Sequence, residues 1–277
     1  MRKMRLCGKF QAISLGGKEG LAVVVHLFLF LYIDKTKVND NIRVQIKMQR
    51  SKQMIELKEL ANMVDHTLLR ADATKEEFQR LCQEADDYGF KMVAINSYPV
   101  AICREFLKNS KVHVGAAIGF PLGQTTIETK VFEVEDAIKN GADEIDYVIN
   151  IGQLKDGNLA YIREEMKAIV NASREGGIIS KVILENCYLT DDEKMAVCQI
   201  AKEVKPDFVK TSTGFGTGGA TIADVQLMKK VVGNDVKVKA AGGIRDLNTA
   251  LKMIEAGAER LGTSSGIKII EEYQREG

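Results

Sequence analysis

Charged side chains inside otherwise apolar stretches give the first indication of chemistry in this sequence. Lys210 follows the apolar residues Phe208 and Val209 and precedes a glycine-rich loop, and Lys239 has the same position in the next such run. Two lysines that point into one enclosed space have a lowered pKa, because desolvation and the neighbouring cation both disfavour the ammonium form. A neutral lysine amine can add to a carbonyl carbon. A single such lysine is more often a surface or phosphate-binding cation, but the pair favours a nucleophile.

Asp146 supplies a carboxylate in a third apolar run. It follows Ile145 and precedes the residues YVI, so we expect its side chain to point inward, toward the two lysines. A carboxylate in that position serves either as a salt-bridge partner only or as a proton shuttle that works through water. The two nearby lysines favour the shuttle.

Other charged residues also lie in the apolar runs. Asp65 lies in the first of them, and Glu144 opens the run that holds Asp146, where we expect it to be solvated. Lys181, within SKVILEN, is a candidate third cation. Its expected partner is Glu185, because residues an even number apart lie on one face of a strand. Structural ion pairing fits Lys181 and Glu185 at least as well as catalysis.

Glycines and hydroxyls cluster late in the chain. Gly242 and Gly243 follow one apolar run, and Ser264 and Ser265 lie within GTSSG at 262–266. Glycines alone are weak indicators because turns also need them. In α/β barrels, however, the loops after the last two strands commonly bind phosphate with backbone N–H groups and a short helix N-terminus. We therefore predict an enzyme for a small phosphorylated carbonyl compound that works through lysine, without a metal or cofactor.

These residues must be held by short strands that alternate with amphipathic helices. The expected strands are Asp65–Leu69, Met92–Asn96, Val112–Ile118, Glu144–Asn150, Lys181–Glu185, Phe208–Thr211, Val236–Ala240 and Arg260–Gly262. The expected helices are Ala73–Tyr88, Pro99–Leu107, Glu128–Asn140, Asn158–Glu175, Thr190–Val204, Ile222–Val232, Leu247–Ala256 and Ile267–Arg275. Thr74 and Glu77 predict a capping box, and Gly89 predicts a helix C-cap.

Eight strand–helix units in one chain predict a (β/α)8 TIM barrel. The runs KMVAIN and FVKTS are typical of strands buried on both faces, as parallel sheets require. The main alternative is a doubly wound open sheet, but no G-x-G-x-x-G motif follows the first strand. We assign the barrel to residues 54–277.

Residues 1–53 do not fit the barrel pattern. They carry 11 Lys/Arg against 3 Asp/Glu and contain a 13-residue apolar run, Leu21–Ile33. This run is shorter than the roughly 20 residues that span a membrane. The segment could be a membrane or export signal, a loosely attached extension, or the product of an over-long translation start. We favour the last, because an amphipathic helical pattern, MIELKELANMV, begins at Met54 and leads directly into the first strand.

Charge and cysteine usage exclude several classes of protein. The remainder of the chain carries 28 Lys/Arg against 35 Asp/Glu, which argues against a nucleic-acid-binding protein. Five cysteines are scattered without C-x-x-C spacing, and three histidines show no metal-ligand pattern. These features favour a cytoplasmic protein with reduced thiols and neither a disulfide framework nor a histidine-based metal site.

Several motifs resemble the deoxyribose-phosphate aldolase family of class I Schiff-base aldolases. They are DHTLL at 65–69, GFPLG at 119–123, ADEIDYVIN at 142–150, KVILE at 181–185, VKTSTGFGTGGAT at 209–221, KAAGGIR at 239–245 and GTSSG at 262–266. The similarity runs from Met54 to Ile270, about four-fifths of the chain. VKTSTGFGTGGAT and KAAGGIR carry most of the specificity.

The resemblance implies reversible cleavage of 2-deoxy-D-ribose 5-phosphate to glyceraldehyde 3-phosphate and acetaldehyde, a reaction of nucleoside catabolism. It implies that Lys210 forms the Schiff base, that Lys239 lowers the pKa of Lys210, and that Asp146 moves protons with a water molecule. The implied phosphate site comprises Gly242, Gly243, Ser264 and Ser265, and supporting roles fall to Asp65, Lys181 and Thr213. Some members of the family have a phosphate-binding lysine soon after TSTG, but here Phe215 and Gly216 follow. The resemblance also implies a homo-oligomer, a dimer or larger.

Two other functions remain open at this stage. One is a different Schiff-base barrel aldolase, such as a transaldolase or a lysine-type fructose-bisphosphate aldolase. The other is a non-catalytic barrel that binds a sugar phosphate as a sensor or scaffold. The presence of Lys210, Lys239 and Asp146 together favours an active enzyme.

Overall fold

The computed structural model describes residues 55–276. The predicted extension at 1–53, with its apolar run, lies outside the described residues, and the boundary at residue 54 stays a prediction. Within the described part of the chain, no helix combines the length and the apolar character needed to cross a membrane.

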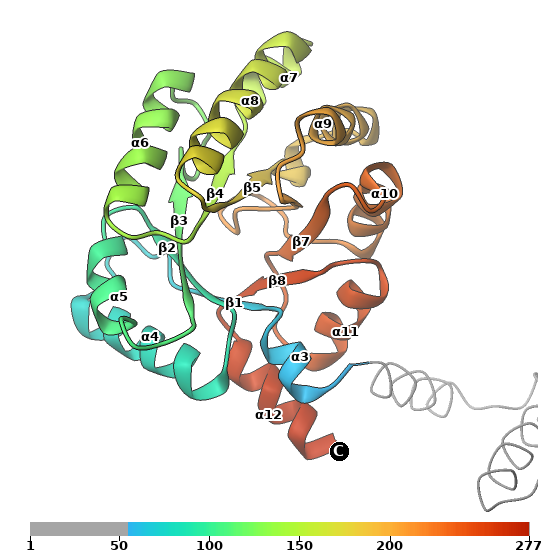
Figure 1. Ribbon diagram of the computed structural model, residues 1–277. Coiled ribbons are helices and arrows are strands. Elements are labelled where there is room, and N and C mark those ends of the chain that lie inside the picture. The colour runs from blue at the N-terminus through green and yellow to red at the C-terminus, as the bar shows by residue number, and fades with distance from the viewer. Residues whose placement is uncertain (1–54, 277) are drawn as a thin grey trace, which may run out of the picture. The chain divides into compact units, whose positions relative to one another are not determined.

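Eight parallel strands close into a barrel in the order of the sequence (Figure 1). The barrel closes where the first strand pairs with the eighth, with Asp65 opposite Gly262. This confirms the TIM barrel and is incompatible with the open doubly wound sheet. The strands are β1 (Val64–Thr67), β2 (Met92–Asn96), β3 (His113–Ile118), β4 (Glu144–Val148), β5 (Ile179–Ile183), β6 (Phe208–Lys210), β7 (Lys237–Ala241) and β8 (Arg260–Thr263).

Helices surround the barrel, one or more after each strand (Figure 1). Those that match the predictions to within a few residues are α4 (Lys75–Tyr88), α5 (Val100–Phe106), α6 (Ile127–Lys139), α8 (Leu159–Glu175), α9 (Asp191–Val204), α10 (Ile222–Val232), α11 (Leu247–Glu255) and α12 (Gly266–Glu276). The helical pattern before the first strand forms only a short helix, α3 (Leu57–Ala61). The structure adds α7 (Ile151–Lys155) and a 3-10 turn, η1 (Asn186–Tyr188).

The capping box and the C-cap glycine predicted from the sequence are both present in α4. Thr74 accepts a hydrogen bond from the backbone of Glu77, and the Glu77 side chain accepts one from the backbone N–H of Thr74, which is the complete capping box. Gly89 ends the helix in the left-handed region, with φ of 67°. At the other end of the chain, α12 packs against α3, and the Tyr273 hydroxyl donates to the carbonyl oxygen of Ile55 at 2.9 Å.

Several predicted strands extend past their observed ends: the first, fourth and fifth by two residues each and the sixth by one. The fourth ends at Val148, because Asn150 caps α7 by accepting a hydrogen bond from the backbone N–H of Gln153. The fifth ends at Ile183, and Glu185 has a left-handed backbone with φ of 57° before η1 begins. Glu185 therefore does not share a strand face with Lys181.

The register of neighbouring strands brings the predicted site residues side by side. Asp146 on β4 lies opposite Lys181 on β5, and Lys210 on β6 lies opposite Lys239 on β7. Successive side chains of a strand point to opposite faces of the sheet. All these charged groups are buried, and their contacts with one another show that they point into the barrel.

Candidate active site

Asp146 is the centre of a buried cluster of charged side chains inside the barrel. Its Oδ2 accepts hydrogen bonds from Lys210 Nζ at 2.7 Å and from Lys239 Nζ at 2.6 Å. Its Oδ1 accepts from Lys181 Nζ at 2.8 Å. The structure therefore brings together the two lysines and the carboxylate that the sequence singled out, with the candidate third cation.

The environment separates the pKa values of these groups. Burial, together with the positive charge of Lys239, lowers the pKa of Lys210 to about 8, although the Asp146 carboxylate opposes the change. Burial alone would raise the pKa of Asp146, but the charges of Lys181, Lys210 and Lys239 outweigh it and hold that pKa well below its ordinary value. Asp146 is thus a carboxylate at neutral pH, and Lys210 is the lysine that most readily becomes a neutral amine.

The ion-pair partners of Lys181 are not the one predicted from the sequence. Its Nζ lies 2.6 Å from Glu144 Oε2 and 2.8 Å from Asp146 Oδ1, and it does not pair with Glu185. Glu144, which we expected to be solvated, is fully buried. The expectation failed because Glu144 faces the barrel interior, where the positive charges of Lys181 and Arg260 lower its pKa against the effect of burial.

Glu185 and Thr213 form a separate contact at the edge of the cluster. The backbone N–H of Thr213 donates to Glu185 Oε1 and Oε2 at 3.2 Å each, and the Thr213 hydroxyl also donates to this carboxylate. These bonds hold the start of the loop that follows Lys210. Thr213 therefore lies beside the cluster, and its supporting role stays a prediction.

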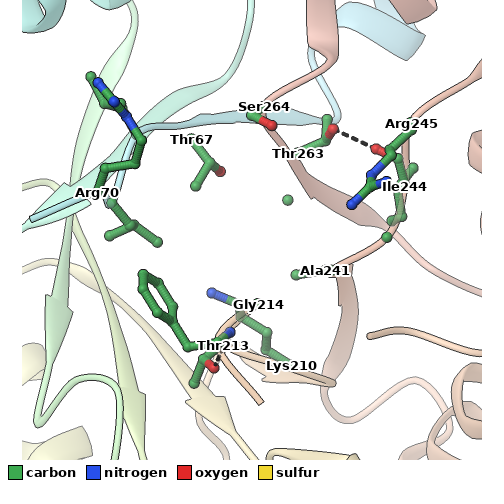
Figure 2. Close-up of a pocket in the computed structure, with 16 residues that line it drawn as sticks. Thr67, Arg70, Lys210, Thr213, Gly214, Ala241, Ile244, Arg245, Thr263 and Ser264 are labelled. Carbon is green, nitrogen blue, oxygen red and sulfur yellow. Dashed lines mark hydrogen bonds between the residues drawn. The ribbon is translucent and has the colours of Figure 1, made fainter. Parts of the chain in front are cut away.

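An open cavity of about 410 Å³ lies above the cluster at the carboxyl ends of the strands. The amine of Lys210 projects into it, while Lys181 and Lys239 do not line it (Figure 2). Gly242, Gly243 and Ser264 line the wall contributed by the last two loops. The other lining residues are Thr67, Leu68, Leu69, Arg70, Thr213, Gly214, Phe215, Ala241, Ile244, Arg245, Gly262 and Thr263.

The glycine-rich wall depends on close packing between two loops. A Cβ atom on Gly219 would lie only 2.3 Å from the carbonyl oxygen of Gly242. Gly242 and Gly243 have φ of 86° and 79°, a region that side-chain-bearing residues rarely adopt. Ser265, predicted with Ser264, is not among the lining residues, and its backbone N–H donates to the Thr263 hydroxyl at 2.9 Å.

Two arginines on the rim were missed in the sequence. Arg245 lies across the opening from Lys210, is exposed, and makes no ion pair with the residues of 55–276 (Figure 2). Arg70 extends away from the opening, where it forms ion pairs with Asp72 and Glu77 (Figure 2). Arg245 ends the motif KAAGGIR, two residues after the paired glycines of the predicted phosphate site. That position was the sequence signal that could have identified it.

Within residues 55–276, no group of three or more His, Cys, Asp or Glu side chains is arranged to hold a metal ion. The buried cluster beneath the cavity can perform amine chemistry. A lysine with a lowered pKa faces an open cavity, and a carboxylate that can exchange protons is bonded to its amine.

Comparison with known proteins gives a consistent result. Residues 59–272 match the DeoC/LacD family aldolase. Deoxyribose-phosphate aldolase of Lactobacillus acidophilus is 58% identical over 213 residues, which cover 77% of this chain and 90% of that protein. The enzyme of the same name from Thermococcus kodakarensis is 54% identical over 216 residues, covering 77% of this chain and 96% of that protein. Among solved structures, the tetrameric deoxyribose phosphate aldolase of Aeropyrum pernix has a TM-score of 0.76 at 30% identity, covering 82% and 96% of the two chains.

Proposed function

The chain belongs to the DeoC/LacD family of aldolases, and from this premise we propose that Lys210 forms a Schiff base with the aldehyde carbon of the substrate. The proposed reaction is reversible cleavage of 2-deoxy-D-ribose 5-phosphate to D-glyceraldehyde 3-phosphate and acetaldehyde. Relatives more than 50% identical, named deoxyribose-phosphate aldolase, support this substrate. The observation that carries the residue assignment is the position of the Lys210 amine, which projects into the cavity with a pKa of about 8.

The geometry supports a mechanism with Asp146 as the proton shuttle. Neutral Lys210 adds to the aldehyde carbon of the sugar, and loss of water from the carbinolamine gives an iminium ion. Asp146, bonded to the Lys210 amine at 2.7 Å, is close enough to deliver and accept the protons of these steps. Removal of the 3-hydroxyl proton then breaks the C2–C3 bond and releases glyceraldehyde 3-phosphate. The remaining enamine takes a proton at C2, and hydrolysis of the new iminium releases acetaldehyde and the free lysine.

Lys239 and Lys181 act on this chemistry through Asp146. Both donate to the carboxylate, so they hold it in position and stabilise its negative charge. The charge of Lys239 also contributes to the lowered pKa of Lys210. Asp65, whose Oδ2 lies 2.5 Å from Lys239 Nζ, holds Lys239 in turn.

We assign the phosphate group of the substrate to the cavity wall formed by Gly242, Gly243 and Ser264. Backbone N–H groups near a helix N-terminus favour an anion, and α12 begins at Gly266 in this loop. Ser265 follows Ser264 in the same loop and belongs to the proposed phosphate site. Arg245, exposed on the opposite rim from Lys210, supplies a positive charge that no lysine after TSTG provides here.

Trapping the Schiff base tests the proposal directly. The protein is incubated with acetaldehyde and then borohydride, and peptide mass spectrometry locates the ethyl group that reduction leaves on lysine. We expect a label on Lys210 that is absent in Lys210→Ala and unchanged in Lys230→Ala, whose lysine is exposed on α10. A label on Lys239 instead would exchange the roles of the two lysines. A folded protein that takes no label would contradict the Schiff base and favour a non-catalytic barrel.

We also propose a cytoplasmic homo-oligomer. The tetramer of the Aeropyrum pernix relative supports an oligomer, and light scattering after size exclusion would measure its size. The four described cysteines are free thiols, three of them buried, which fits a reducing compartment. A nucleoside-catabolic role follows from the proposed substrate.

A further inference from the structure

The charged groups beneath the cavity form a closed ring of ion pairs. Asp65 Oδ2 lies 2.5 Å from Lys239 Nζ, which lies 2.6 Å from Asp146 Oδ2. Asp146 Oδ1 lies 2.8 Å from Lys181 Nζ, which lies 2.6 Å from Glu144 Oε2. Arg260 Nη1 completes the ring, 3.2 Å from Glu144 Oε2 and 2.7 Å from Asp65 Oδ1. The charges alternate, and each member contacts two of opposite sign.

Lys210 is attached to this ring but is not part of it. Its ion pair within the described residues is with Asp146 Oδ2, the oxygen that Lys239 also binds. The ring contains as many carboxylates as cations, so it is neutral when all its members are charged. A protonated Lys210 therefore adds one uncompensated positive charge to a buried cluster, and such a charge is unfavourable away from water.

We propose that Glu144 and Arg260 are positioning residues of the aldolase reaction: they close a ring of alternating charges that keeps Lys181 and Lys239 protonated and leaves Lys210 as the amine that releases its proton. This inference rests on the proposed function and extends it. Neither residue lines the cavity, and both act through the lysines and carboxylates they contact. They lie on β4 and β8, at the opposite end of the ring from Lys210.

The titration behaviour of the ring agrees with its geometry. Burial would lower the pKa of Lys181, but Asp146 and Glu144 outweigh it and raise that pKa. The pKa of Arg260 is also raised, because Asp65 and Glu144 outweigh burial. Lys210 shares its carboxylate with another cation, and burial together with the charge of Lys239 lowers its pKa.

Charged and aromatic groups face the cluster from several strands. Lys210 faces Asp146 on β4, Lys181 on β5 and Lys239 on β7, and its Nζ lies 6.0 Å from the centre of the Phe120 ring. Beneath the ring, Glu144 Oε1 lies 2.7 Å from His113 Nδ1, whose Nε2 lies 3.0 Å from Lys91 Nζ. The aromatic ring of Phe208 lies 5.1 Å from the Arg260 guanidinium. None of these outer contacts adds a carboxylate for Lys210.

Removing a negative or a positive charge from the ring should shift the pH at which Lys210 releases its proton in opposite directions. Glu144→Gln leaves an excess of cations, so Lys210 should release its proton at lower pH. Arg260→Met leaves an excess of carboxylates, so Lys210 should keep its proton to higher pH. We expect shifts on the order of one pH unit each, about 1.4 kcal/mol, because charges separated by other members of the ring still interact in the protein interior. The double variant restores the balance and should return toward the wild-type value, and Arg260→Lys should stay near it.

The experiment measures the pH dependence of Lys210 labelling by acetaldehyde and cyanoborohydride in the full-length chain, from pH 6 to 10. Circular dichroism at each pH establishes which variants are folded. Opposite shifts of the inflection in the two single variants, with recovery in the double variant, would support the ring, since a merely structural loss lowers activity without moving the inflection in opposite directions. Unmoved inflections, or shifts of the same sign, would overturn it.

The unaltered protein provides a second measurement that needs no variant to fold. The ring predicts that Lys210 is ethylated while Lys181 and Lys239 stay unlabelled up to pH 10. Labelling of Lys181 or Lys239 at a rate comparable with Lys210 would contradict the ring. Absence of label from Lys210 in the wild-type protein would contradict the proposed function itself, whereas wild-type labelling with unshifted variants would contradict only the ring.

Discussion

Among the three lysines around Asp146, accessibility distinguishes Lys210 from the others. Its side chain lines the cavity, whereas Lys181 and Lys239 are fully buried beneath it. Each of those two also contacts two carboxylates, which favours the ammonium form. The number of carboxylates that each amine contacts, together with access to the cavity, therefore favours Lys210 as the amine of the proposed Schiff base.

The pKa of Lys210 predicts how Schiff-base formation depends on pH. A pKa of about 8 leaves about a tenth of the amine neutral at pH 7, compared with less than about a thousandth for an ordinary lysine. The initial rate of ethyl labelling should therefore rise as pH increases from 6 and level off above 8. Lys230, which is exposed on α10 and lies outside the barrel interior, serves as the internal comparison. A wild-type inflection for Lys210 close to 10 would show that the barrel does not activate this amine.

Arg245 predicts a difference between phosphorylated and unphosphorylated substrates. Replacing Arg245 with Ala should raise KM for deoxyribose 5-phosphate on the order of 10-fold, because a charge-assisted contact with phosphate is lost. The kcat/KM for 2-deoxyribose should change little. Arg70→Ala is the matched control, since this guanidinium is engaged with Asp72 and Glu77. Equal losses on both substrates would argue against a phosphate contact.

At the level of elements, the end of β4 is held from outside the barrel by a second buried ion pair. Lys130 on α6 lies 2.5 Å from Glu165 Oε1 on α8, and its Nζ donates to the carbonyl oxygen of Val148 at 2.7 Å. Glu165 Oε2 accepts from the backbone N–H of Asn150 at 3.0 Å. Two helices thereby fix the backbone that immediately follows Asp146.

This arrangement predicts a large loss of stability when one partner is removed. Lys130→Met leaves the Glu165 carboxylate buried without its cation, which costs about 3–5 kcal/mol of unfolding free energy. Lys130→Met combined with Glu165→Gln should lose less, because no unpaired charge remains. Urea unfolding measures both, with Lys139→Met, an exposed position on the same helix, as the control. A single variant no less stable than the double variant would contradict the coupling.

At the level of the whole molecule, the barrel encloses its charges through closure of β1 on β8. Asp65 and Arg260 are 195 residues apart in sequence, yet their ion pair completes the ring at this seam. The outer layer is closed nearby, where α12 packs on α3 and Tyr273 bonds to the backbone of Ile55. The first described residues of the chain thus take part in the same closure.

These contacts predict that a protein starting at Met54 keeps the barrel and its activity. It retains α3, the Ile55 carbonyl and every residue of the cluster. We expect kcat/KM within about twofold of the full chain and a thermal midpoint within a few degrees, because every contact described above is retained. Removing residues 1–62 instead deletes α3 and should lower the midpoint clearly. Loss of activity on cutting at Met54 would show that the preceding residues contribute to function.

The sequence by itself determined the barrel and singled out the residues proposed to be catalytic. Alternation of β-branched runs with amphipathic helices is a local property of the chain, so the eight units could be identified, to within a few residues at each end. Lys210, Lys239 and Asp146 could be singled out because a charge inside an apolar run is unusual wherever the run lies. The capping box at Thr74 was visible for the same local reason.

Only the tertiary structure decided which charges are partners. The sequence paired Lys181 with Glu185 and treated Glu144 as solvated, whereas the barrel pairs Lys181 with Glu144 and Asp146. The positions of Arg260 and Arg245 relative to the site became known only from the pairing of β8 with β7 and from the loop after β7, which lines the cavity. The period of two along a strand identifies which residues share a face, but register and barrel closure decide which strands meet across it. Those are properties of pairings distant in sequence, so no local pattern contains them.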